Sequence, residues 1–327
     1  MAIKLYIDAI RDALQYEMRR DESIFVLGED VGVRGGVFRV TQGLIEEFGE
    51  ARVIDAPLAE SAIVGVAIGA AAYGMRPVAE IQFADFILPA VNQIISEAAK
   101  MRYRSNNDWS CPLVIRAPFG GGVHGALYHS QSLEALFYHV PGLKVVIPST
   151  AADAKGLLIA AMRDPDPVLF FEHKGLYRLV KDDVPDGEHV VPIGKAALRR
   201  EGTDITVITY GLMAHYVLEA VKDLEQEGIS AHVLDLRSIL PLDRDAIVAA
   251  ARQTGKVLIV HEDNKTGGVG AEVSAIIAEE ALFDLDAPIA RLCGPDIPAM
   301  PFNAPQEKFY MLSPAKIAEA MRQLAAF

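Results

Sequence analysis

The stretch that decides the fold is RVIDAPLAESAIVGVAIGAA, residues 52–71. Its first residues predict a short strand, and the run of small and apolar residues after Asp-Ala-Pro predicts a helix. Glu60 lies where this helix should begin. The helix dipole by itself stabilises a carboxylate there by about 0.3–1 kcal/mol. The competing explanation is that the Glu60 carboxylate points into a ligand-binding crevice, since ligands of parallel α/β sheets bind beyond the carboxyl ends of the strands.

Gly65 and Gly69 lie four residues apart on the same predicted helix, with alanines around them. Residues spaced by four share one face of a helix, and glycine adds no side-chain bulk to that face. We therefore expect another helix to approach closely here. Such an approach would place Glu60 at the mouth of an interface.

The chain has 327 residues, which suggests two domains, with a single domain as the alternative. Hydrophobic residues make up 51% and charged residues 23%, which indicates an ordinary globular protein. The net charge of -13 argues against nucleic acid and anionic membranes as partners, because both bind basic patches. It leaves room for a basic protein partner.

Two cysteines occur, Cys111 and Cys293, far apart in the sequence. They form neither a disulfide framework nor a metal knuckle and indicate a reducing compartment. Residues 1–21 predict an amphipathic helix and not a signal peptide, since they lack an uninterrupted apolar core and a cleavage site. The longest apolar run, residues 62–75, is shorter than the roughly 18 residues of a membrane-spanning helix. We therefore expect a cytoplasmic protein.

Strand and helix patterns alternate along the chain and predict an α/β fold with two doubly wound, mostly parallel sheets. Near-continuous apolar runs suit strands that are buried on both faces of such a sheet. Residues 84–105 repeat apolar side chains at helical spacing and predict one helix. The runs predicted to be strands are residues 23–28, 52–55, 76–81, 111–118, 143–149, 167–172, 205–211, 230–236, 256–263 and 288–294.

The alternation breaks around residues 175–195, which are polar and contain prolines and glycines. This composition is typical of a linker between domains. We therefore expect a first domain at residues 1–178, a linker at 179–197 and a second domain at 198–327.

A glycine-rich loop, APFGGGVHGALYHSQS at residues 117–132, follows a predicted strand and contains His124 and His129. Such a loop at the end of a strand can bring the backbone close to a ligand. The two histidines lack the cysteine or nearby carboxylate that would complete a zinc site. For either histidine by itself, a structural role in the loop is the first expectation.

The segment KTGGVGAE, residues 265–272, follows a strand and opens a helix, as a dinucleotide-binding turn does. The dinucleotide fingerprint needs glycine at its sixth position, which counted from Gly268 is Val273, so the match fails. The chain also has no P-loop and no Gly-Asp-Gly motif followed by asparagine, which would hold a magnesium diphosphate. The sequence therefore predicts only half of a cofactor site.

Five long motifs in collinear order resemble the beta subunit of the thiamine diphosphate-dependent decarboxylating component of 2-oxo acid dehydrogenase complexes. The resemblance covers essentially the whole chain. The motifs are LGEDVGVRGGVF (27–38), DAPLAESAIVGVAIGAAAYGMRPVAEIQFADF (55–86), KMRYRSNNDW (100–109), GGGVHGALYHSQSLEA (120–135) and LDLRSILPLD (234–243).

The resemblance implies a transketolase-like pyrimidine-binding domain followed by a transketolase C-terminal domain. It implies an α2β2 heterotetramer with thiamine diphosphate between α and β, in which the alpha subunit holds the diphosphate and its magnesium. It also implies binding to the lipoyl and subunit-binding domains of an acyltransferase component, and a small 2-oxo acid as substrate.

Site residues follow from the resemblance position by position. Glu60 matches the carboxyl group that bonds to a ring nitrogen of the cofactor's aminopyrimidine and drives the imino form, which deprotonates the thiazolium carbon. Phe86 matches the aromatic residue that stacks on the pyrimidine, and Leu58 and Gln82 match its other neighbours. Glu29 matches an acid that relays protons between the two active sites.

His129 matches the histidine that acts as acid–base catalyst when the acyl group passes to lipoamide. His124 has no counterpart in the pyruvate-specific relatives, and its role stays open. The resemblance further implies a potassium ion near residues 111–114 and 161–166, held by backbone oxygens.

The motifs EIQFADF and HGALYHSQS favour the members that act on branched-chain 2-oxo acids, because pyruvate-specific relatives usually carry methionine in place of Gln82. A beta subunit acting on pyruvate or acetoin is the alternative. An NAD-binding dehydrogenase is a remote alternative, against which the failed glycine fingerprint argues. A non-catalytic scaffold subunit is a third, against which Glu60 and His129 argue.

Overall fold

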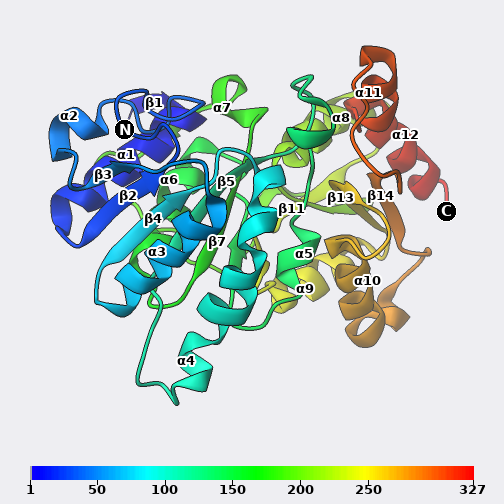
Figure 1. Ribbon diagram of the computed structural model, residues 1–327. Coiled ribbons are helices and arrows are strands. Elements are labelled where there is room, and N and C mark those ends of the chain that lie inside the picture. The colour runs from blue at the N-terminus through cyan, green and yellow to red at the C-terminus, as the bar shows by residue number, and fades with distance from the viewer. Residues whose placement is uncertain (1) are drawn as a thin grey trace. The chain divides into compact units, whose positions relative to one another are not determined.

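The computed structural model describes residues 2–327, which form two compact units. The first unit comprises residues 2–119 and Leu136–Ile193, and the second comprises Gly120–Ala135 and Gly194–Phe327. Figure 1 shows the elements of both units along the chain. The glycine-rich loop thus belongs to the second unit, although the chain on both sides of it belongs to the first.

The first unit is built on parallel strands in the order β6-β7-β5-β4-β2-β3. β2, β5 and β7 are buried at every residue, as the continuous apolar runs predicted. The bounds are β2 (Ile24–Gly28), β3 (Val53–Asp55), β4 (Arg76–Glu80), β5 (Val114–Phe119), β6 (Lys144–Val146) and β7 (Val168–His173).

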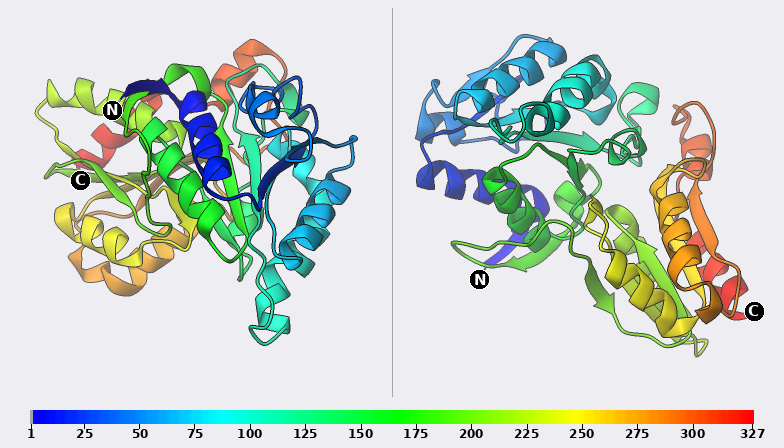
Figure 2. Two further views of the ribbon diagram at one scale, coloured as in Figure 1. Left: turned by 90° about the vertical axis from the view of Figure 1, so that its left-hand side faces the viewer. Right: turned by 90° about the horizontal axis from the view of Figure 1, so that it is seen from below.

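Helices pack on both faces of this sheet. α1 (Tyr6–Arg20) and α6 (Ala151–Arg163) lie side by side on one face, and α3 (Glu60–Ala72) packs with η1 (Ala84–Ala90) on the other (Figures 1 and 2). The short helices of this unit are α2 (Leu44–Phe48) and α7 (Leu176–Leu179). α5 (Ala135–Tyr138) also belongs to it, except for its first residue, Ala135.

One sequence prediction about helices needs correction. The N-terminal helix begins only at Tyr6, because β1 (Ala2–Leu5) pairs antiparallel with β8 (Lys181–Val184). Residues 84–104 are helical throughout, as predicted, although the type of helical turn changes along them from η1, which contains Pro89, to α4. The segment after η1 divides into η2 (Gln93–Glu97), η3 (Ala98–Lys100) and α4 (Met101–Arg104).

The second unit has a five-stranded sheet in the order β14-β13-β10-β11-β9, parallel except for β9. α8 packs with α12, and α9 packs with α10. The bounds are β9 (Ala197–Arg200), β10 (Ile205–Thr209), α8 (Leu212–Glu225), β11 (Ala231–Asp235), β12 (Ser238–Leu240), α9 (Arg244–Thr254), β13 (Val257–Asn264), α10 (Val269–Glu280), η5 (Leu282–Asp284), β14 (Ala290–Gly294), α11 (Ala304–Tyr310) and α12 (Pro314–Ala325). Within residues 2–327, no helix combines the length and apolar character needed to cross a membrane.

A buried guanidinium joins the central strands of the first sheet. Arg116 on β5 donates to Glu80 on β4 at 2.6 Å and to Glu172 on β7 at 2.6 and 2.8 Å. The Tyr177 hydroxyl donates to the same Glu172 carboxylate at 2.6 Å. All four side chains are almost fully buried. A buried charge is tolerated when it is paired and hydrogen-bonded, as each of these is.

Replacing Arg116 by methionine should destabilise the protein by about 3–5 kcal/mol, because two carboxylates would lose their buried counter-charge. Urea unfolding followed by fluorescence measures this loss. Arg104→Ala is the matched control, since Arg104 pairs with Glu97 at the surface and such pairs contribute less than about 1 kcal/mol. A loss no larger for Arg116→Met than for the control would show that the buried pair does not hold the sheet.

Candidate active site

Five of the predicted site residues follow three neighbouring strands of the first unit. Glu29 follows β2, Leu58 and Glu60 follow β3, and Gln82 and Phe86 follow β4. β4, β2 and β3 are adjacent and parallel, so their carboxyl ends meet at one edge of the sheet. Ligands of parallel α/β sheets bind at such an edge.

Two carboxyl groups influence each other at this edge. Glu60 is the first residue of α3, as predicted, and its side chain is partly exposed. The pKa of Glu29 is raised by burial, and further by the negative charges of Glu60 and Asp30. Glu29 therefore keeps its proton to a higher pH than an ordinary glutamate. A pair of this kind can exchange protons with a ligand.

Aromatic and aliphatic side chains complete the edge. Phe86 is half-buried and stands edge-on to Phe83, with ring centroids 5.6 Å apart. Phe83 in turn stands edge-on to Phe38 at 5.4 Å. Leu58 at the same edge is 79% exposed.

The glycine face of α3 is open. Apart from the chain neighbours and the nearby backbone of α3 itself, no described atom lies within 4 Å of the Cβ positions that Gly65 and Gly69 would have. Val66 on the same helix and Tyr73, just after its last residue, are 60% and 92% exposed. The close helix approach predicted at these glycines is therefore not made within the described chain, and the face is free for another chain.

The edge fits the aminopyrimidine ring of thiamine diphosphate. A carboxyl group, an amide, an aromatic ring and an exposed leucine suit a flat, nitrogen-containing ring that needs both stacking and hydrogen bonds. Among residues 2–327, no group of three or more His, Cys, Asp or Glu is placed to hold a metal ion.

His129, the sixth predicted site residue, lies in the loop Gly120–Ala135 of the second unit and is half-buried. It follows a short turn, η4 (Ala126–Tyr128). His124 in the same loop donates its backbone N–H to Glu307 at 3.2 Å, and its imidazole contacts the same carboxylate. His124 therefore ties the loop to α11.

Sequence reasoning missed a group of buried acids against this loop, Glu134, Glu262 and Asp263. Burial, and then the charge of Asp263, raises the pKa of Glu134 well above its ordinary value, and Tyr210 donates to Glu134 at 3.0 Å. Burial raises the pKa of Asp263 to about 6. The available signal was the pair of acids, Glu262 and Asp263, that ends the strand predicted at residues 256–263.

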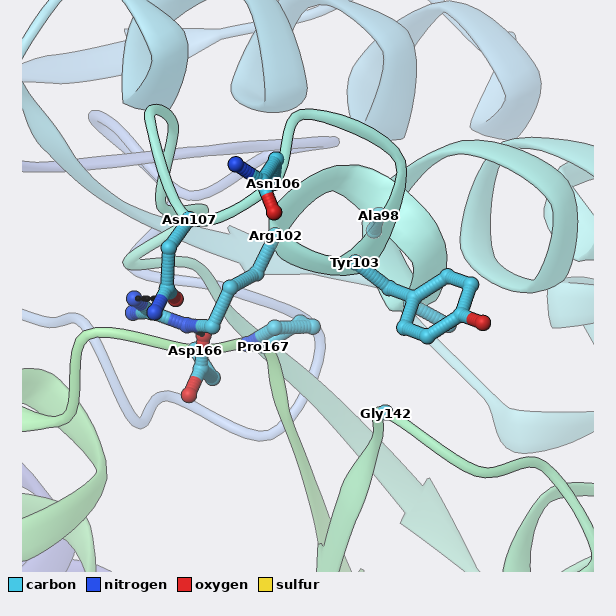
Figure 3. Close-up of a pocket in the computed structure, with 9 residues that line it drawn as sticks. Ala98, Arg102, Tyr103, Asn106, Asn107, Gly142, Asp166 and Pro167 are labelled. Carbon is cyan, nitrogen blue, oxygen red and sulfur yellow. Dashed lines mark hydrogen bonds and ion pairs between the residues drawn. The ribbon is translucent and has the colours of Figure 1, made fainter.

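A separate cavity of about 630 Å³ lies in the first unit beside α4 (Figure 3). Arg102 crosses it and donates to Asp166 at 2.6 Å and to Asn107 at 3.2 Å. None of the six predicted site residues lines it. Its walls are Ala98, Ala99, Arg102, Tyr103, Asn106, Asn107, Gly142, Asp166 and Pro167.

The segments predicted to hold potassium contact each other, since Cys111 N–H donates to the Pro165 carbonyl at 3.1 Å. The Asp164 carbonyl accepts a bond from Arg76 at 3.2 Å, and the Asp164 carboxylate accepts two from Lys144 at 2.6 and 2.7 Å. A carbonyl oxygen has two lone pairs. The potassium site stays a prediction.

Two family models match the chain, the transketolase pyrimidine-binding domain over residues 4–180 and the transketolase C-terminal domain over residues 194–317. The chain is 67% identical to the 2-oxoisovalerate dehydrogenase subunit beta of Bacillus subtilis (strain 168), with all of both chains covered. It is 49% identical, again over all of both chains, to the pyruvate dehydrogenase E1 component subunit beta of the same organism.

Solved structures give the same fold. A chain titled split gene transketolase, inactive beta4 tetramer, matches with a TM-score of 0.80 at 25% identity, over 98% of both chains. A transketolase from Pichia stipitis matches all of this chain and 46% of its own with a TM-score of 0.72, and at 15% identity it shows the fold alone.

Fold and site together define a transketolase-like protein of the thiamine diphosphate-dependent class. Within that class the chain belongs to the family of 2-oxo acid dehydrogenase beta subunits. The fold class and the family predicted from the sequence motifs are confirmed.

Proposed function

We propose that this chain, with an alpha subunit in an α2β2 assembly, decarboxylates branched-chain 2-oxo acids oxidatively and passes the acyl group to the lipoyl group of an acyltransferase component. The observation that carries the proposal is the convergence of Glu29, Glu60 and Gln82 at one sheet edge. The higher identity to the 2-oxoisovalerate enzyme, 67% against 49% for the pyruvate enzyme, supports the branched-chain substrate.

A pyruvate substrate is the second candidate, and it rests on the 49% identity to the pyruvate enzyme over the whole chain. The two candidates share one mechanism and differ in the pocket that holds the substrate's side chain. Turnover of 2-oxoisovalerate and of pyruvate by the assembled protein separates them.

The residues of this chain have distinct tasks in the proposed reaction. Thiamine diphosphate, when bound, supplies the thiazolium carbon at which decarboxylation occurs. Glu60 shares its carboxyl proton with the pyrimidine nitrogen, and its partly enclosed position keeps that bond strong. Phe86, Leu58 and Gln82 hold the ring in place. Glu29, whose pKa is raised, returns and removes protons at the same edge.

An alpha subunit is the partner that completes the site. It would cover the open glycine face of α3 and supply the site for the diphosphate and its magnesium. The related split-gene transketolase chain is described as an inactive tetramer of beta chains alone. The two free cysteines fit the cytoplasmic location that we propose for the assembly.

Glu60→Gln should assemble normally and lower turnover by about 10²–10⁴-fold, because a neutral amide cannot share a proton with the pyrimidine ring. Hydrogen–deuterium exchange at the thiazolium carbon in the assembled protein measures the step directly. Glu46→Gln is the matched control, since Glu46 also lies in the first turn of a helix but is exposed. Wild-type exchange in Glu60→Gln would reduce Glu60 to a helix-end charge.

His129→Ala should lower the overall reaction about 10²–10⁴-fold more than decarboxylation assayed with an artificial electron acceptor, because a histidine near neutral pH can take and give the proton of acyl transfer. His139→Ala, at an exposed histidine, is the control. Equal losses in the two assays would move His129 to decarboxylation or cofactor binding. No loss in either would leave it a structural loop residue.

The second domain should dock a basic subunit-binding module of the acyltransferase component. The net charge of -13 and the exposed C-terminal residue Phe327 motivate this assignment. Charge-driven docking weakens with salt, so the affinity should fall about tenfold or more between low and 0.5 M salt. Titration calorimetry at both concentrations measures it, and an unchanged affinity would indicate an apolar interface.

A further inference from the structure

One carboxylate oxygen joins the two ends of the loop that carries His129. Gly121 N–H, near the start of the loop, donates to Glu262 Oε1 at 2.6 Å. The Ser132 hydroxyl, near its end, donates to the same oxygen at 3.2 Å. The adjacent bond from Gly120 N–H to the Gln131 carbonyl, at 3.0 Å, closes the base of the loop.

The surroundings of this oxygen make both bonds strong. Glu262 is 4% exposed on β13, and Gly121 is buried. Bonds to an ionised carboxylate are roughly twice as strong as neutral ones, and low dielectric strengthens them further. A Cβ at Gly121 would lie 2.8 Å from Met311 Sδ and against Met300 Cε, so the ends of two methionine side chains cover the backbone here.

We propose that Glu262 is a positioning residue, which sets the place of His129 by holding both ends of the Gly120–Ala135 loop on β13. The inference rests on the proposed function of His129 in acyl transfer, to which it adds a residue that touches neither cofactor nor substrate.

Neighbouring acids hold single points of the same loop. Asp263 accepts the Ala135 N–H at 3.2 Å, and Glu307 accepts the His124 N–H at 3.2 Å. Of these three acids, Glu262 is the one whose bonds link the first part of the loop, at Gly121, to its last part, at Ser132. The pKa of Glu134, a fourth acid of this group, is raised well above its ordinary value, chiefly by burial.

The test uses the assembled α2β2 protein with three variants, Glu262→Ala, Glu262→Gln and the exposed control Glu272→Ala. Loss of the anchor should speed hydrogen–deuterium exchange of the 120–132 backbone in Glu262→Ala. The overall reaction should fall about 10²-fold more than artificial-acceptor decarboxylation, since a misplacement of about 1 Å can cost that much. Glu262→Gln keeps an acceptor oxygen and should restore most of both properties. Glu272→Ala should match wild type.

The informative ratio is the rate of the overall reaction divided by the rate of artificial-acceptor decarboxylation. If His129→Ala lowers this ratio but Glu262→Ala leaves both the ratio and the backbone exchange as in wild type, the inference about Glu262 is overturned and the proposed role of His129 stands. Equal loss of both reactions in Glu262→Ala, without rescue by Glu262→Gln, would overturn it too, because that pattern marks general destabilisation. A wild-type ratio in His129→Ala would instead overturn the proposed role of His129, and with it the acyl-transfer part of the inference.

Discussion

The ion pairs of Arg116 are the constraint on which the first unit depends. The guanidinium bonds to Glu80 on one side and Glu172 on the other, inside a sheet that excludes water. β4 and β7 cannot shift along β5 without leaving a buried charge unpaired, which costs several kcal/mol. The register of β4 also places Gln82, two residues beyond Glu80. The adjacent strands β2 and β3 bring Glu60 to the same edge.

The proposed division of the cofactor site between two chains rests on the residues that this chain gathers at the carboxyl ends of β2, β3 and β4. They include Glu29 and Glu60, whose charges interact, and the aromatic ring of Phe86. The loop Gly120–Ala135 falls within the pyrimidine-binding family match at residues 4–180, yet it packs with the second unit. The buried carboxylates Glu262 and Asp263 at the end of β13 explain this, since they accept its N–H groups.

Most of the fold could be predicted because buried parallel strands are continuous apolar runs, and the position of Glu60 could be predicted from the strand, turn and helix around it. The pairing of residues 2–5 with 181–184 could not, since short edge strands carry little apolar signal and their partners are distant in sequence. The changes of turn type within residues 84–104 could not be predicted either, since the apolar spacing continues through Pro89. Glu262 escaped prediction because its partners are loop N–H and O–H groups that only the folded chain brings near.

The central claim is that this chain holds the pyrimidine half of a shared cofactor site, with Glu60 as its acid. Titration calorimetry of thiamine diphosphate with magnesium, on the purified chain alone and after addition of its alpha subunit, tests that claim most directly. The account predicts no micromolar, magnesium-dependent binding by the chain alone and its appearance once the alpha subunit is added. Micromolar magnesium-dependent binding by the chain alone would contradict it.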